Sequence, residues 1–274
     1  MIGVFDSGLG GLSVLAAIAR ALPQADLLYY ADSAHVPWGE KPDGFIHGRV
    51  LAIGRELEVR GCSLIVVACN TATTKAIGAL RAALPGVPIV GIEPGIKPAA
   101  ASSRSRHIAV LATAATAASE RLRQLVAQHA HGVRVDVIAC PGWATHVETL
   151  QPATLAFRAE VATTILPLLE RGVDRLVLGC THYAFLGPII APLIAGRAEM
   201  VEVAEAVARQ VVRLYRGHKS GQGRLRLMAS ARVDRLMAAL PALGLSWLAE
   251  RCAPSLGGDE GGRRIAPSPS PVLP

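Results

Sequence analysis

Aromatic residues, long apolar runs and signal-like segments are scarce in this sequence. Phe, Trp and Tyr make up 4% of its 274 residues, which favours packed helices and parallel strands over an all-β sandwich. No apolar run approaches the length needed to span a bilayer. Residues 1–11 show no basic stretch followed by an apolar one, so no secretory signal is expected. These absences predict a soluble, cytoplasmic protein with no membrane partner.

Clustered charge is also lacking. The formal net charge is +7, but Lys and Arg are scattered singly, and the longest basic cluster is the pair Arg263 and Arg264. Nucleic-acid binding as a primary role usually requires a concentrated basic surface. The charge therefore indicates an ordinary solvated surface, and no nucleic-acid partner is expected.

The cysteines show neither an even count nor a short paired spacing. There are five of them in a chain expected to stay in a reducing compartment, which argues against a disulfide framework. Their free thiols then need a packing role or a chemical one. The five are Cys62, Cys69, Cys140, Cys180 and Cys252.

Short apolar runs alternate with helical patterns along most of the chain. The expected strands are residues 2–5, 27–31, 64–68, 88–92, 108–111, 133–139, 176–178, 200–203 and 224–231. The expected helices are residues 11–22, 45–60, 72–83, 119–129, 154–171, 205–216 and 232–240. This alternation predicts an α/β fold with mostly parallel sheets flanked by helices. Residues from 254 onward are rich in Gly, Pro and Ser and predict disorder.

A weak internal repeat predicts two halves related by pseudo-symmetry. The stretch GCSLIVVACNTAT from Gly61 matches GVDRLVLGCTHYA from Gly172, at an offset of 111 residues. The stretch IGVFDSGLGGLS from Ile2 matches IAVLATAATAAS from Ile108, at an offset of 106. Ligands in open α/β sheets lie beyond the carboxyl ends of the strands. Two such ends facing each other would enclose a small pocket.

Cys69 and Cys180 each come directly after an apolar strand and before a polar, helix-starting segment. We expect the helix amino terminus to lower the thiol pKa in both places, and Asn70-Thr71 to cap the helix after Cys69. Such thiols could act as a nucleophile, as metal ligands with His182, or as acid/base groups. No CxxC spacing accompanies them, so no metal is expected.

Stereoinversion is a reaction that two matched thiols would suit. One group must remove a proton from one face of a carbon while another delivers a proton to the opposite face. Asp6 and His182 are the acid and the imidazole expected to assist the thiols. The glycines of GLGG lack the spacing of a dinucleotide fingerprint and predict a tight turn beside a small ligand.

These segments together resemble the glutamate racemase family of bacterial cell-wall synthesis. The matching motifs are GVFDSGLGG, YADSAHVPWG, VVACNTAT, GIEPGIKPA, LATAAT and LGCTHYAFL, in the family's order up to about residue 245. The resemblance implies cofactor-independent conversion of L-glutamate to D-glutamate, supplied for peptidoglycan. It implies two α/β domains with the active site in the cleft between them, and a homodimer. The expected domains are residues 1–97 with 207–252 and residues 98–206, followed by a disordered tail at 253–274.

The resemblance also assigns roles to single residues. Cys69 and Cys180 would be the acid/base pair, with Asp6 assisting Cys69, His182 assisting Cys180, and Glu148 as a third assisting acid. Glutamate would be held by Asp6, Ser7, Pro37, Trp38, Gly39, Cys69, Asn70, Thr71, Thr113, Thr116, Cys180, Thr181 and His182. By the same resemblance, Cys180 would face the α-proton of L-glutamate.

The sequence departs from the family pattern at two places. Trp38 stands where the family usually has Tyr, and Val203-Ala204 replaces an Asp-Ser or similar pair. Two alternatives stay open: a racemase of the same superfamily acting on aspartate, and a non-catalytic regulator that keeps the fold. Retention of both thiols and of their assisting residues disfavours the regulator.

Overall fold

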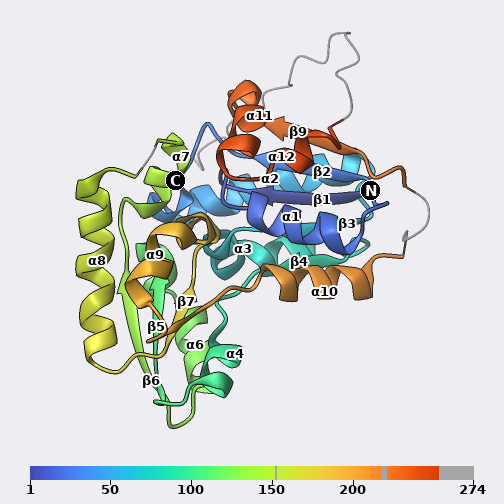
Figure 1. Ribbon diagram of the computed structural model, residues 1–274. Coiled ribbons are helices and arrows are strands. Elements are labelled where there is room, and N and C mark those ends of the chain that lie inside the picture. The colour runs from blue at the N-terminus through green and yellow to red at the C-terminus, as the bar shows by residue number, and fades with distance from the viewer. Residues whose placement is uncertain (152, 217–220, 253–274) are drawn as a thin grey trace, which may run out of the picture.

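The computed structural model describes residues 1–151, 153–216 and 221–252. Two separate parallel sheets organise this part of the chain (Figure 1). The predicted tail at 253–274 lies outside the described residues. Among those residues, no helix combines the length and the apolar character needed to cross a membrane.

The first sheet has the strand order β4-β3-β1-β2-β9, with every neighbouring pair parallel. Its strands are β1 (Ile2–Asp6), β2 (Leu27–Ala31), β3 (Leu64–Val67), β4 (Ile89–Gly91) and β9 (Leu225–Ala229). The associated helices are α1 (Leu12–Ala21), η1 (Trp38–Glu40), α2 (Asp43–Val59), α3 (Asn70–Ala83), α10 (Ala204–Leu214), α11 (Val233–Ala242) and α12 (Ser246–Ala249).

The second sheet has the order β6-β5-β7-β8 and is also parallel. Its strands are β5 (His107–Ala112), β6 (Arg134–Ala139), β7 (Arg175–Leu178) and β8 (Glu199–Val201). The helices are α4 (Ile96–Ser102), α5 (Ala114–Ala117), α6 (Glu120–His129), α7 (Trp143–Thr149), α8 (Leu155–Glu170), η2 (Thr181–Leu186) and α9 (Gly187–Ile194).

The predicted pseudo-symmetry is visible in the strand order. The series β4-β3-β1-β2 in the first sheet corresponds to β8-β7-β5-β6 in the second, and β9 is an addition to the first. The register agrees as well. Phe5 lies opposite Val67 in one sheet and Leu111 opposite Leu178 in the other, at the same offsets of 106 and 111 residues as the sequence repeat.

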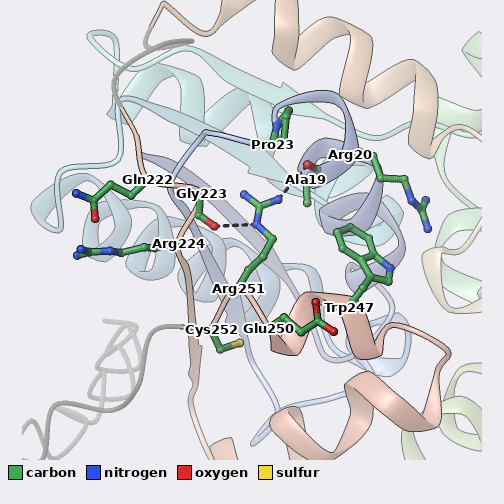
Figure 2. Close-up of a pocket in the computed structure, with 10 residues that line it drawn as sticks. All are labelled: Ala19, Arg20, Pro23, Gln222, Gly223, Arg224, Trp247, Glu250, Arg251 and Cys252. Carbon is green, nitrogen blue, oxygen red and sulfur yellow. Dashed lines mark hydrogen bonds between the residues drawn. The ribbon is translucent and has the colours of Figure 1, made fainter.

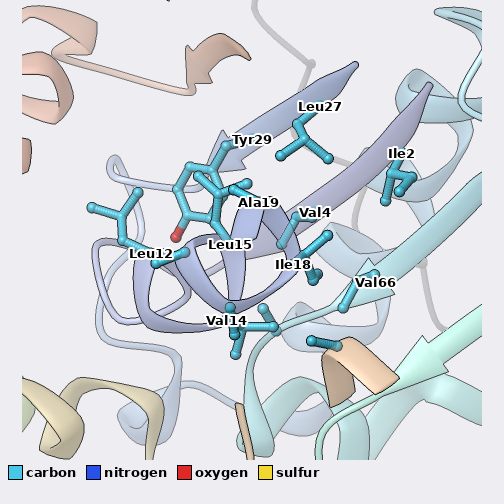
Figure 3. Packing of buried hydrophobic residues seen from close by; sticks show 14 of the residues in the cluster. Ile2, Val4, Leu12, Val14, Leu15, Ile18, Ala19, Leu27, Tyr29 and Val66 are labelled. Carbon is cyan, nitrogen blue, oxygen red and sulfur yellow. The ribbon is translucent and has the colours of Figure 1, made fainter. Parts of the chain in front are cut away.

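Alternate side chains of each central strand enter two different cores, as expected for a sheet covered on both faces. In β1, Ile2 and Val4 pack with α1 and α10, whereas Phe5 packs on the other face with α2 and α3. Figure 3 shows the first of these clusters, in which side chains of α1 pack against those of β1 and β2. Burial on both faces explains why these strands read as continuous apolar runs.

The α/β alternation is confirmed, and every expected strand and helix is present within two residues at each end. Three helices of seven or eight residues were not predicted: α4, α7 and α9. Pro98 lies within α4, Pro188 and Pro192 lie within α9, and α7 follows a left-handed Gly142. Proline and glycine are typical of turns, so their local signal contradicts the helix that tertiary packing stabilises.

The chain crosses between the sheets twice, after β4 and after β8, and the two crossings touch. A Cβ atom placed on Gly95 would lie 2.9 Å from Cγ1 of Val203 and 3.0 Å from Cγ1 of Val201. Such distances leave no room for a side chain at residue 95. The two connections therefore form one compact junction between the halves.

Candidate active site

Cys69 and Cys180 occupy equivalent positions in the two halves. Each is an extended residue that precedes a helix, α3 after Cys69 and the 3₁₀ helix η2 after Cys180. Both are buried, with 6% and 7% of their surface exposed. A small cavity is lined by residues of both halves, including Asn70, Cys180 and Thr181. The predicted placement of both thiols at strand ends is therefore confirmed.

The expected capping at Cys69 is wrong in detail. Helix α3 begins at Asn70 rather than at residue 72, Cys69 itself is the N-cap, and no side chain caps the helix. Both polar side-chain atoms of Asn70 are buried without a hydrogen-bond partner. A buried amide without a partner is costly, so these atoms are positioned to meet a polar ligand.

Asp6 ends β1 beside the strand that carries Cys69. Its Oδ2 atom accepts hydrogen bonds from the backbone nitrogens of Gly11 at 3.0 Å and Gly8 at 3.3 Å, while Oδ1 has no partner. Burial raises the pKa of Asp6, and the positive charge on His182 and the two amides only partly oppose it. Asp6 is thus a buried carboxyl group with one oxygen free toward the site.

The expectation of a lowered pKa at Cys69 is contradicted. Burial raises the pKa of this thiol well above its ordinary value, and the nearby charge of Asp6 raises it further. A hydrogen bond from the backbone of Ala72 lowers it, but by less. Full desolvation thus outweighs the helix terminus. The protonated form of Cys69 is consequently favoured.

Cys180, His182 and Glu148 form a linear chain of contacts. Sγ of Cys180 lies 3.6 Å from Nδ1 of His182, and Nε2 of His182 lies 2.6 Å from Oε1 of Glu148. The backbone nitrogen of Gly10 is also 3.3 Å from Nε2. The shorter, charge-assisted contact determines the tautomer, so Nε2–H donates to Glu148 and Nδ1 faces the thiol.

The charge state of His182 follows from these neighbours. Burial alone would lower its pKa, but hydrogen bonds and charges from Cys180 and Glu148 outweigh burial and raise the pKa well above its ordinary value. The raised pKa favours a proton on His182, so the imidazole is suited to hold a proton beside Sγ of Cys180. Cys180 thus lies beside an imidazole that favours a positive charge, whereas Cys69 lies beside the buried carboxyl group of Asp6.

Glu148 reaches this position because it lies on α7, one of the helices that was not predicted. Its Oε1 also accepts a hydrogen bond from the backbone nitrogen of Leu9 at 2.6 Å. The side chain of Arg235, on α11, donates to the backbone carbonyl of Glu148. Glu148 therefore has hydrogen-bond partners in both halves, His182 in the second and Leu9 and Arg235 in the first.

The glycines of DSGLGG were expected to form a tight turn beside a small ligand. In the structure, side chains of the second half lie directly against them. A Cβ atom on Gly8 would lie 2.0 Å from Oε1 of Glu148, and one on Gly10 would lie 2.3 Å from Nδ1 of His182. The glycines therefore make room for the side chains of Glu148 and His182 from the other half. Neither distance could be tolerated without displacing those groups.

Three threonine hydroxyls meet across the two halves. Oγ1 of Thr71 lies 3.1 Å from Oγ1 of Thr113 and 3.4 Å from Oγ1 of Thr116, which are 3.2 Å from each other. Together with the amide of Asn70 and the hydroxyl of Thr181, these groups offer neutral hydrogen bonds. Such donors can hold a small carboxylate without a buried basic side chain.

The segment 36–39 touches the site through the side chain of Val36 and through Gly39 rather than through Trp38. A Cβ atom on Gly39 would lie 2.9 Å from Cβ of Thr113, and one on Gly8 would lie 2.8 Å from Cγ2 of Val36. Trp38 has no exposed surface and packs with Phe5 in the core. The Trp-for-Tyr departure therefore changes the core behind the pocket and not its rim.

The second departure, at Val203, falls at the start of α10. Val203 is the N-cap of that helix and makes no side-chain hydrogen bond. A hydroxyl or carboxylate at this position would satisfy a free backbone donor there. Val203 instead packs against Gly95 and lines the small cavity.

A larger hollow of about 940 Å³ is lined by residues of the first half alone (Figure 2). Its walls include Arg251 and Trp247, near the amino-terminal ends of β2 and β9, whereas the thiols lie beyond the carboxyl ends of the strands. Arg251 donates to the carbonyl oxygens of Gly223, Ala19 and Ala25. These bonds join three segments of the first half, so Arg251 is occupied by a structural role.

Sequence comparison agrees with this geometry. The profile of the Asp/Glu/Hydantoin racemase family matches residues 2–211. A glutamate racemase of Methylococcus capsulatus is 47% identical over 246 residues, covering 90% of this chain and 85% of that protein. One of Pseudomonas aeruginosa is 42% identical, covering 88% and 93%.

Solved structures show the same fold. A glutamate racemase of Bacillus anthracis superposes with a TM-score of 0.78 at 28% identity, covering 92% of this chain and 95% of that one. The enzyme of Escherichia coli, in complex with L-glutamate and the activator UDP-MurNAc-Ala, gives 0.75 at 28% identity, covering 88% and 94%. The chain therefore belongs to the Asp/Glu/Hydantoin racemase family. Within it, the chain is an isomerase of the glutamate racemase group.

Proposed function

We propose that this enzyme interconverts L- and D-glutamate by direct proton transfer between two thiols, without a cofactor. The observation that carries the proposal is the pairing of Cys69 and Cys180 at equivalent strand ends, each with its own ionisable neighbour. Both thiols lie at one buried site, where a charge on Cys180 raises the pKa of Cys69. Two acid/base groups from opposite halves match the requirement of stereoinversion.

In the proposed reaction, His182 takes the proton of Cys180 and leaves a thiolate. The thiolate removes the α-proton of L-glutamate, and the electron pair stays on the substrate as a carbanion. Cys69 then donates its thiol proton to the opposite face, giving D-glutamate. In the reverse direction the two thiols exchange roles. The protonated state of Cys69 and the raised pKa of His182 support this starting arrangement.

The remaining polar groups would hold the substrate and stabilise the carbanion. The unpartnered amide of Asn70 and the hydroxyls of Thr71, Thr113 and Thr116 are suited to the carboxylates. The free Oδ1 atom of Asp6 is suited to the ammonium group. Ser7, Thr181 and the backbone of Pro37 to Gly39 complete the proposed pocket.

Racemisation in D₂O tests the proposal. Circular dichroism should show conversion of both enantiomers of glutamate, and mass spectrometry should show one deuterium at the α-carbon of each product. Because the returning proton comes from a different, solvent-exchanged thiol, recovery of product that retains its own proton would contradict the two-base mechanism. Turnover of aspartate alone would instead favour the related aspartate-specific activity.

The same assay tests the cofactor proposal. Activity should persist in EDTA and without added pyridoxal phosphate. Among the described residues, no group of His, Cys, Asp and Glu is arranged to hold a metal ion. Complete loss on chelation, restored by zinc, would overturn this proposal in favour of a metal site.

We further propose that the enzyme is a cytoplasmic homodimer whose D-glutamate is used for peptidoglycan, because the family resemblance implies each of these properties. We also propose domain limits of 1–97 with 207–252 and 98–206, supported by the two crossings between the sheets. Light scattering would measure the assembly. Complementation of a D-glutamate auxotroph would test the cellular role, and failure of an active enzyme to restore growth would contradict it.

A further inference from the structure

Asp32 is a fully buried carboxylate outside the set of residues considered so far. It follows β2 directly, has no exposed surface, and its backbone nitrogen donates to the carbonyl of Asp6 at 3.0 Å. Burying a charge is costly unless it is paired and hydrogen-bonded. The groups that pair with Asp32 therefore indicate the structural role of its buried charge.

Arg49 of α2 is the counterion. Its Nε and Nη2 atoms donate to the two oxygens of Asp32 at 2.9 Å and 2.7 Å, and its own exposure is 6%. Burial alone would raise the pKa of Asp32, but the hydrogen bonds and charge of Arg49, together with hydrogen bonds from His35 and Ser230, outweigh burial and lower that pKa. A two-point contact of this kind fixes direction as well as distance.

The side chain of Ser230, which follows β9, also hydrogen-bonds to the carboxylate. Two further partners belong to the segment that leads into the site. The indole Nε1 of Trp38 donates to Oδ2 of Asp32 at 3.1 Å, and Nδ1 of His35 lies 3.0 Å from Oδ1. The backbone nitrogen of His35 also donates to the carbonyl of Asp32 at 2.9 Å. The carboxylate thus holds both ends of the turn formed by residues 35–38.

The same turn lies against residues that border the proposed pocket. Val36 packs against Gly8, which itself adjoins Glu148, and Gly39 packs against Thr113. These are contacts of van der Waals closeness with residues from both halves of the molecule. A shift of the turn would therefore move the wall of the pocket.

We propose that Asp32 is a positioning residue, which with Arg49 and Trp38 fixes the segment 36–39 as the substrate-facing wall. The proposal rests on the proposed glutamate site. Asp32 has no part in proton transfer, so its loss weakens glutamate binding more than it slows the chemical steps. A merely structural role would lower stability and leave binding by the folded enzyme unchanged.

The decisive variants are Asp32→Asn and Trp38→Phe in the full chain. Asp32→Asn should raise the KM for both enantiomers about tenfold, the scale of one charge-assisted hydrogen bond, with a much smaller change in kcat. Trp38→Phe keeps the aromatic packing and the Asp32–Arg49 pair, and it should raise KM in the same direction by less. It remains informative if Asp32→Asn does not fold.

The matched control is Asp136→Asn. Asp136 on β6 contacts Arg171 at 3.0 Å and His107 at 3.1 Å, away from the thiols. Its substitution should lower the melting temperature without changing KM. If Asp32→Asn and Trp38→Phe also lowered the melting temperature without changing KM, the positioning role would be wrong.

Calorimetric binding of D-glutamate separates this proposal from the proposed function. If the parent binds glutamate but does not racemise it, the proposed reaction fails, while the variants still report on the wall through their Kd. Weaker binding in the variants supports the role of Asp32, and equal binding overturns it. A parent that does not bind glutamate would overturn both.

Discussion

His182 occupies the position in the second half that Thr71 occupies in the first. The two are 111 residues apart, the same offset that separates Cys180 from Cys69. On the neighbouring strands, Ala112 stands where Asp6 would be expected from the offset of 106. One thiol therefore adjoins a carboxyl group and the other an imidazole. The backbones of the two halves are thus pseudo-symmetric, but the ionisable groups beside the two thiols differ.

Replacing either of the two thiols proposed as catalytic should slow racemisation in both directions. Cys69→Ser and Cys180→Ser each place a far weaker acid on one wall, and the loss should be about 10²–10⁴-fold in kcat for each enantiomer. Circular dichroism measures both rates. The controls are Cys62→Ser, Cys140→Ser and Cys252→Ser, which should keep most activity. Near-parent rates in either catalytic variant would show the two-thiol mechanism to be wrong.

Glu148→Gln should move the alkaline limb of the pH profile to lower pH. Glu148 helps to raise the pKa of His182, so the imidazolium is present at low pH and is lost as pH rises through that pKa. In the Glu148→Gln variant the pKa of His182 falls, so the imidazolium and the activity are lost at a lower pH. The measurement is kcat/KM against pH, with Glu160→Gln, whose carboxylate accepts a hydrogen bond from Trp143, as the control. An unshifted limb would contradict the role of Glu148.

Gly10→Ala should reduce kcat by about tenfold or more, because misplacing a catalytic group by a fraction of an ångström is costly. The added methyl would lie 2.3 Å from Nδ1 of His182 and 2.7 Å from Oγ1 of Thr181. Gly78→Ala is the control, since no atom lies within 4 Å of its added methyl and it is within α3. That control should keep activity and gain about 0.5–1 kcal/mol of stability. Equal kcat in the two variants would refute the close-approach argument.

Truncation after residue 253 should leave melting temperature and turnover nearly unchanged. The expectation rests on composition, because residues 254–274 are dominated by Pro, Ser, Gly and charged residues that supply little apolar surface. Differential scanning calorimetry and the racemase assay measure the two quantities. A large drop in melting temperature would show that the segment contributes to the core.

Local sequence signals were sufficient to predict the positions of those candidate site residues that lie at the end of a single strand. Asp6, Cys69, Cys180 and His182 each follow a buried apolar run, so their positions could be predicted from the run alone. The paired offsets predicted the pseudo-symmetry of the two halves, and the register of the two sheets agrees with it. These features depend on residues that are close in the sequence.

The remaining features depend on distant contacts. Glu148 lies on a short helix that begins after a left-handed glycine, and only packing against the first half places its carboxylate. Asp32 lies in a matched motif, but its link to Arg49 spans 17 residues and has no local signature. The raised pKa of Cys69 was missed because the depth of burial, unlike the helix terminus, cannot be read from neighbouring residues.

The addition of β9 to the first sheet affects the order in which the halves can be completed during synthesis. All four strands of the second sheet have been made once the ribosome has passed Val201. The first sheet, although it contains the amino terminus, still lacks its edge strand until Leu225–Ala229 emerges and pairs with β2. The half that starts first is thus the one that finishes last. The second sheet can therefore be complete before the edge beside β2 is closed, whereas the surroundings of Cys180 that come from the first half, including the bond of Arg235 to Glu148, are completed only afterwards.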